Sequence, residues 1–141
     1  MDIPVNYLAV LVAGLSNMVI GYLWYGPLFG KMWMKLSGTK MSSGGKTSAT
    51  GGYIISYVGA VIIAYILAHF IYLNAKGMGV DITTTSAITT AFWGWLGFIV
   101  PTSIASVLWE GKSWNLWFLG IAYWLVSLIA MAAILVGMGG Y

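Results

Sequence analysis

The chain contains very little charge. Of its 141 residues, 6% are charged and 60% are hydrophobic, whereas a soluble domain has about 25% charged residues. Such a chain cannot cover its surface with polar groups in water, which excludes a water-soluble globular domain. Long uncharged intervals separate the charges, which lie at Asp2, Lys31, Lys35, Lys40, Lys46, Lys76, Asp81, Glu110 and Lys112.

Other absences narrow the function. Cysteine is missing, so the chain has neither a disulfide framework nor a thiolate site. It also lacks arginine and a basic patch away from the helix ends, which argues against a nucleic-acid partner. The single histidine, His69, and three scattered carboxylates do not have the spacing of a metal site or of a nucleophile with its base. We therefore expect no metal, no cofactor and no catalytic residue, and an enzyme is the least supported function.

The uncharged intervals have the length of membrane-spanning helices. A hydrocarbon core of about 30 Å takes roughly 20 apolar helical residues to cross, and the intervals near 4–27, 53–75, 84–108 and 114–138 satisfy that length. No ten-residue unit alternates as a membrane β-strand does. The first interval lacks the basic start of a signal peptide and is too long for its apolar region. We predict an all-α integral membrane protein, with one four-helix transmembrane domain over residues 1–141.

The lysines indicate an orientation. Four of them lie between the first and second intervals and Lys112 lies between the third and fourth, whereas Lys76, beside Asp81, lies between the second and third. An excess of lysine in short loops marks the cytoplasmic side. We therefore predict a plasma-membrane protein with both termini outside the cytoplasm and the first and third loops inside.

The stretch "LWYGPLFGKMW" predicts how the first helix ends. Trp24 and Tyr25 fall at the depth of the lipid headgroups, where amphipathic rings are favoured. Pro27 lacks an N–H and disfavours a helical conformation at Gly26, so the span should stop there.

A short interfacial helix is predicted over about 29–37, followed by a flexible linker over about 38–52. Lys31 and Lys35 lie on one face of this helix, and Met32, Trp33 and Leu36 lie on the other. Such a helix suits the membrane surface, with its apolar side in the lipid and its lysines among lipid phosphates. The predicted membrane-interface residues are Trp24, Tyr25, Lys31, Trp33, Lys35, Trp109 and Trp114.

Small residues recur at helical spacing on three of the spans. Lipid provides no hydrophobic drive between helices, so small faces with polar groups are used for packing. Three such faces predict a tight bundle with surface left for a second copy, that is, a homo-oligomer. The faces are Ala13, Asn17 and Gly21; Ser56, Ala60, Ala64 and Ala68; and Ser86, Thr90, Gly94 and Gly97.

The segment "FWGWLGFIVP" favours a kink or a locally unwound turn in the third helix. Backbone freed at this depth must be satisfied by protein or by water, and broken helices often mark substrate sites in transporters. Good packing of rings against glycine is the alternative. The candidate ligand or path residues are Asn17, Thr90, Trp93, Gly94, Gly97 and Pro101.

His69 is the remaining candidate. With Tyr65 it could form a polar pocket or relay a proton, since its pKa is ordinarily close to neutral. The alternative is a histidine at the interface, bonded to a tyrosine or to a carbonyl group.

The chain also contains an internal similarity. "LWYGPLFGKMW" ends the first span and "LWEGKSW" ends the third, while both the second and fourth end in Gly-Met-Gly. Two helices per half would make this a parallel repeat. The alternative explanation is that Trp, Lys and Gly are common at every membrane interface.

Taken together, these motifs resemble a family of small prokaryotic membrane proteins, domain of unknown function 1761. The resemblance covers nearly the whole chain apart from the linker. It implies a four-helix integral membrane protein, and it transfers no activity and no catalytic residue. The residues that carry it are Trp24, Tyr25, Pro27, Phe29, Gly30, Lys31 and Trp33; Trp95, Leu96, Gly97, Phe98 and Pro101; and, less well matched, Ala122 and Tyr123.

Two functions remain open. One is a homo-oligomeric transporter-like or channel-like protein for a small solute or amphiphile, whose substrate is unknown. The other is a non-catalytic membrane module that binds lipid or a protein partner through Trp33, Lys31 and Lys35 of the interfacial helix.

Overall fold

The computed structural model of the protein describes residues 2–38, 49–139 and 141. Over these residues the chain is helical and contains no strand, which confirms the all-α prediction. The elements are α1 (Tyr7–Leu23), the π-helical turn η1 (Trp24–Leu28), α2 (Gly30–Ser37), α3 (Ala49–Met78), α4 (Thr84–Gly94), the π-helical turn η2 (Trp95–Ile99), α5 (Val100–Ser103), α6 (Ala105–Leu108) and α7 (Trp114–Gly137).

Four stretches of helix are long and apolar enough to cross a membrane: Tyr7–Leu28, Ala49–Met78, Thr84–Leu108 and Trp114–Gly137. They match the four predicted spans to within about three residues at each end, except that α3 begins at Ala49 instead of near 53. Helix elongation adds one hydrogen bond per residue once a helix exists, so the end of the predicted linker, 49–52, joins α3. The rest of that linker, 39–48, lies outside the described residues.

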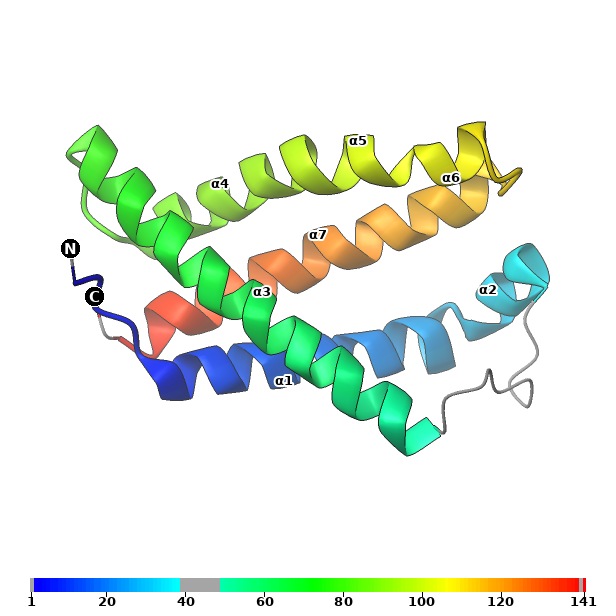
Figure 1. The fold of residues 1–141 in the computed structure, drawn as a ribbon, viewed down its shortest axis with the longest axis horizontal. Coiled ribbons are helices and arrows are strands. Elements are labelled where there is room, and N and C mark those ends of the chain that lie inside the picture. The colour runs from blue at the N-terminus through cyan, green and yellow to red at the C-terminus, as the bar shows by residue number, and fades with distance from the viewer. Residues whose placement is uncertain (1, 39–48, 140) are drawn as a thin grey trace.

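The two ends of the bundle differ (Figure 1). Both chain termini lie at one end, and α2, α6 and the start of α7 lie at the other. The α7 helix packs between α1 and the α4–α6 span, while α3 crosses the bundle diagonally and packs mainly on α1. We call the end that contains α2 and the α6–α7 turn the lysine end, because Lys31, Lys35 and Lys112 lie there.

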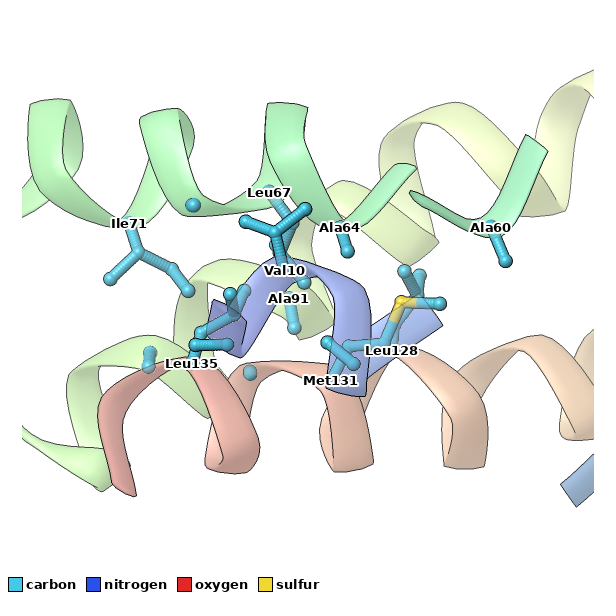
Figure 2. Close-up of a cluster of buried hydrophobic side chains, with 14 residues drawn as sticks. Val10, Ala60, Ala64, Leu67, Ile71, Ala91, Leu128, Met131 and Leu135 are labelled. Carbon is cyan, nitrogen blue, oxygen red and sulfur yellow. The ribbon is translucent and has the colours of Figure 1, made fainter. Parts of the chain in front are cut away.

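Small side chains bring the helices close together in the core. One cluster of buried side chains includes Ala60 and Ala64 of α3, Val10 of α1, Met131 of α7 and Ala91 of α4 (Figure 2). The helices approach closely at Gly14, where an added Cβ would lie 2.7 Å from Val61 Cγ2 and 3.2 Å from the Val61 backbone nitrogen. Because lipid chains are as apolar as these side chains, close packing is what holds such helices together.

The third predicted packing face is not the buried face of α4 within the single chain. Ala87 and Ala91 are the buried residues of α4, whereas a Cβ at Gly94 or Gly97 would meet nothing within 4 Å. The buried face is displaced by one residue, about 100° around the helix. The first two predictions hold better, because Ala13 and Asn17 are buried, as are Ala60, Ala64 and Ala68, although Ser56 is exposed.

Hydrogen bonds tie together the end of the bundle that contains the termini. The Asn6 side chain accepts from the Ala9 amide at 3.2 Å and caps α1. Its amide nitrogen donates to the carbonyl oxygens of Met138 and Gly139, at 3.2 and 3.1 Å. The Tyr141 hydroxyl donates to the Ala68 carbonyl at 3.3 Å. This end is therefore closed by contacts between the first, second and fourth spans.

Candidate functional site

Two π-helical turns flank α7 near the lysine end. Each begins with a tryptophan and has a glycine two positions later. The Trp24 indole N–H donates to the Leu119 carbonyl at 3.2 Å, and the Trp95 indole N–H donates to the Ile121 carbonyl at 2.8 Å. Both turns are thus fastened to α7 within a single helical turn. Because π-helical turns often occur at functional sites, the space between them is the first place to look for one.

The turn η1 interrupts the helix after α1. Gly26 leaves the helical region, with φ −116° and ψ −105°, and the Phe29 amide closes the wide turn on the Trp24 carbonyl at 2.9 Å. The predicted break at Gly26 is therefore present. A Cβ at Gly30 would lie 2.9 Å from the Tyr25 carbonyl oxygen, so glycine is required where α2 begins.

The turn η2 is the local irregularity predicted for the third helix. Pro101 has no N–H to donate to the preceding turn. The Thr102 hydroxyl donates to the Phe98 carbonyl, and the Ser103 hydroxyl donates to the Ile99 carbonyl at 2.7 Å. Further along, the Ser106 hydroxyl donates to the Ser103 carbonyl at 2.8 Å. Hydroxyl groups thereby satisfy backbone carbonyls along this irregular stretch.

A cleft of about 850 Å³ lies between the two turns. We call it the lysine-end cleft. Its volume is within the range of about 300–1,000 Å³ typical of ligand sites. Aromatic and aliphatic side chains form its walls, and hydroxyl groups and one lysine add polar groups. It is lined by Tyr25, Trp33, Leu36, Ser37, Ile99, Thr102, Ser103, Ser106, Gly111, Lys112, Ser113, Leu116, Trp117, Gly120, Ile121 and Trp124.

Ring contacts and a side-chain hydrogen bond fix the aromatic walls. Tyr25 makes edge contacts with Trp33, at 5.4 Å between ring centroids, and with Tyr123, at 5.3 Å. On the opposite wall the Trp117 indole N–H donates to the Ser103 hydroxyl oxygen at 2.9 Å. The rings are held in place before any ligand enters, which lowers the entropic cost of binding.

One lysine gives the cleft its charge. Among the described residues that line it, Lys112 is the one with a charged side chain. Its Nζ lies 3.6 Å from a carboxylate oxygen of Glu110, and both side chains are exposed, so this ion pair is weak. Lys112 follows Gly111, whose φ of +70° makes the turn before α7. A ligand would therefore meet one cation beside apolar walls.

The predicted path residues do not lie together. Asn17 is 5% exposed. Its side-chain amide donates to the Ser127 hydroxyl, and its backbone carbonyl accepts from the Tyr123 hydroxyl at 3.2 Å. It therefore joins α1 to α7. Gly97 and Pro101, although near the cleft in sequence, are exposed and do not line it.

A separate hollow on the face between α3 and α4 contains three of the other path residues. Thr90, Trp93 and Gly94 line this space of about 510 Å³. The Asn74 amide donates to the Thr90 hydroxyl at 2.9 Å, and the Trp93 side chain is 62% exposed. In this arrangement Trp93 faces the surroundings of the bundle.

Tyr65 and His69 lie at a third location. The His69 Nδ1 is 2.8 Å from the Tyr65 carbonyl oxygen, and the two rings are 4.3 Å apart. Tyr65 stacks on Tyr7 of α1. This is the carbonyl-bonded arrangement that was the alternative to a polar pocket.

The predicted membrane-interface residues separate into two groups. Trp24 packs on Phe29 and Tyr123, whereas Tyr25 and Trp33 line the cleft. The others are exposed: Lys31, Lys35, Trp109 and Trp114. In α2, Trp33 and Leu36 turn toward α7 while Met32 remains exposed, so the predicted apolar face is divided.

The prediction from sequence missed most of the cleft. Ser103, Ser106, Trp117 and Trp124 were not among its candidates. The spacing of Thr102, Ser103 and Ser106 along "PTSIAS" places three hydroxyl groups close together on a helix. That cluster after a proline was the available signal.

The fold is that of an α-helical protein in which four helices are apolar enough for a multi-pass membrane protein. The family model described as "Protein of unknown function (DUF1761)" matches residues 8–136. The chain belongs to this family, as its motifs indicated. No curated protein and no solved structure matches the chain.

Proposed function

We propose that the protein is a membrane module that binds an amphiphilic molecule, a membrane lipid, in the lysine-end cleft. The observation that carries this proposal is the composition of the cleft. Apolar and aromatic walls, contributed mainly by α2 and α7 with one residue from each π-helical turn, adjoin a group of hydroxyls and Lys112. An amphiphile needs both environments side by side, with its chains against the walls and its headgroup at the polar rim.

This proposal differs from binding through the lysines of α2. Lys31 and Lys35 are exposed and do not line the cleft, whereas Trp33 on the same helix does. The cleft therefore predicts that lipid binding depends on Trp33 and Trp124 and is insensitive to the two lysines.

Native mass spectrometry of protein purified in mild detergent tests the proposal. Wild type should retain phospholipid, and Trp124→Leu or Trp33→Leu should lose most of it. Trp109→Leu is the matched control, because Trp109 is 85% exposed outside the cleft, and Lys31→Gln with Lys35→Gln is the control for surface charge. Equal retention by the two cleft variants and wild type would contradict the proposal.

Transport of a small solute receives less support. Asn17 is buried against Ser127 of α7, whereas Trp93 lines the hollow between α3 and α4, and the core between α1, α3 and α7 is filled by alanine and larger apolar side chains. Assembly into a homo-oligomer remains a prediction, and the hollow around Trp93 is the surface where we would look for a second copy.

We further propose that the lysine end faces the cytoplasm of a cell membrane. Lys31, Lys35 and Lys112 all lie at that end and Lys76 at the other. Because the chain has no cysteine, single cysteines at positions 78 and 109 can be labelled with an impermeant maleimide in intact cells. Labelling at 78 and not at 109 is expected, and labelling at 109 would reverse the orientation.

A further inference from the structure

The hydrogen bonds that the hydroxyl groups of the lysine-end cleft already make indicate what kind of ligand they can bind. A serine or threonine hydroxyl has one hydrogen to donate and two lone pairs to accept. Three of the lining hydroxyls have already used their hydrogen: Thr102 on the Phe98 carbonyl, Ser103 on the Ile99 carbonyl and Ser106 on the Ser103 carbonyl. What they offer to a ligand is lone pairs, so this wall selects a ligand that donates hydrogen bonds.

The indole groups add a second preference. Ser103 also accepts a hydrogen bond from the Trp117 indole. Thr102 and Ser106 therefore have more lone pairs to offer to a ligand than Ser103 has. Tyr25, Trp33, Trp117 and Trp124 surround the same space. Aromatic faces attract cations, and rings of this kind are used to recognise ammonium groups. Rings and hydroxyl oxygens together favour an ammonium that has N–H groups.

Lys112 supplies the complementary charge. It is a cation among the lining residues, and no carboxylate belongs to the described lining. An ammonium alone would leave Lys112 without an anionic ligand, while a phosphate alone would leave the acceptor lone pairs of Thr102 and Ser106 unused. A headgroup that contains both ions satisfies both parts of the cleft.

We infer that the cleft selects a zwitterionic phospholipid with a primary ammonium, the phosphoethanolamine type of headgroup. Its ammonium lies against Thr102, Ser106 and the rings, and its phosphate lies toward Lys112. Leu36, Ile99 and Ile121 of the cleft hold the start of the acyl chains. This inference rests on the proposed function, since it names the headgroup of the lipid that the cleft binds.

Competition among lipids with identical acyl chains tests it. The full-length protein is placed in nanodiscs with equal amounts of phosphatidylethanolamine, phosphatidylcholine and phosphatidylglycerol, and the lipid that remains bound is weighed by native mass spectrometry. We expect enrichment of phosphatidylethanolamine by roughly tenfold over each of the others, equivalent to about 1.4 kcal/mol. Glycerophosphoethanolamine, which has the headgroup without chains, should compete only weakly, and full competition would overturn binding as a lipid.

Variants separate the contributions. Thr102→Val and Ser106→Ala remove acceptors and should abolish the preference for phosphatidylethanolamine over phosphatidylcholine while total lipid retention persists. Thr89→Val is the matched control, because the Thr89 hydroxyl donates to the Thr85 carbonyl at 2.8 Å in the same manner but lies outside the cleft. Lys112→Gln should lower retention of all three phospholipids.

The outcomes distinguish this inference from the proposed function. Equal enrichment of the ethanolamine and choline lipids would overturn the role of the hydroxyl acceptors, and enrichment of phosphatidylglycerol would overturn the role of the ammonium. In both cases lipid binding itself would stand. If wild type retains no lipid, or if Trp124→Leu retains as much as wild type, the proposed function fails and the inference fails with it.

Discussion

The first and third spans each contain a π-helical turn, but the two spans are buried to different extents. Each has a π-helical turn that begins with a tryptophan bonded to a carbonyl of α7. Yet 28% of the most apolar window of the first span is buried, against 6% for the third. The first lies between α3 and α7, while the third is held mainly by α7, because α3 crosses away from it toward the lysine end (Figure 1).

This difference shows that a glycine in an apolar span does not always mark a contact between helices. Gly14 of the first span receives the backbone of α3 at the residue Val61, whereas Gly94 of the third span has open space beside it. The burial around each position decides the role. In the third span, Gly94 has helical dihedral angles and no close neighbour, so neither backbone geometry nor packing within the chain requires glycine there.

Replacing each glycine with alanine gives the largest expected contrast. In Gly14→Ala the new methyl group would meet Val61, whose branched side chain has little rotamer freedom in a helix, so we expect a loss of about 1–3 kcal/mol. Gly94→Ala should be neutral or stabilise by up to about 1 kcal/mol, since alanine is the better helix former. Unfolding of purified protein in detergent measures both.

A second-site change checks the cause. Val61→Ala removes the Cγ2 atom that lies 2.7 Å from the added methyl group but not the backbone nitrogen at 3.2 Å. It should therefore restore part of the stability lost in Gly14→Ala. Equal effects at positions 14 and 94 would mean that the two spans are packed alike, contrary to the structure.

The same two spans show what can be predicted from sequence. The spans themselves follow from the uncharged intervals, because the length of an apolar run is a one-dimensional property that the bilayer thickness makes decisive. The buried face of α4 is not predictable in this way. Ser86–Thr90 and Ala87–Ala91 are two small-residue tracks one position apart, and only the approach of α7 selects the second.

Most of the candidate site could not be predicted from the sequence, for a related reason. The pattern of α2 shows that Trp33 and Lys35 lie on different faces, but it does not show whether Trp33 meets lipid or another helix. Tyr25 and Trp124 are far apart in the chain and share the cleft because η1 packs on α7. This placement depends on the Gly26 conformation and on tertiary contacts.

Polar pairs provide the next contrast. Asn17 and Ser127 form a buried pair between α1 and α7, whereas Asn74 and Thr90 form an exposed pair between α3 and α4. Double-mutant cycles with Asn17→Leu and Ser127→Ala should give a coupling of about 1 kcal/mol, and those with Asn74→Leu and Thr90→Val less than about 0.5 kcal/mol. A larger coupling at the exposed pair would show that it is shielded, as contact with a second copy would do.

The two tryptophan hydrogen bonds should give the smallest differences. Trp24→Phe and Trp95→Phe each remove an indole N–H and leave an aromatic ring, so each should cost about 0.5–1.5 kcal/mol. Trp95 should lie at the upper end because its bond is shorter, 2.8 Å against 3.2 Å, and because its span has fewer other anchors. Trp109→Phe, at an exposed position, is the control and should leave unfolding in detergent unchanged. If Trp95→Phe proves as harmless as Trp109→Phe, the third span is fastened to α7 by packing alone, and the parallel between the two π-helical turns is one of backbone shape only.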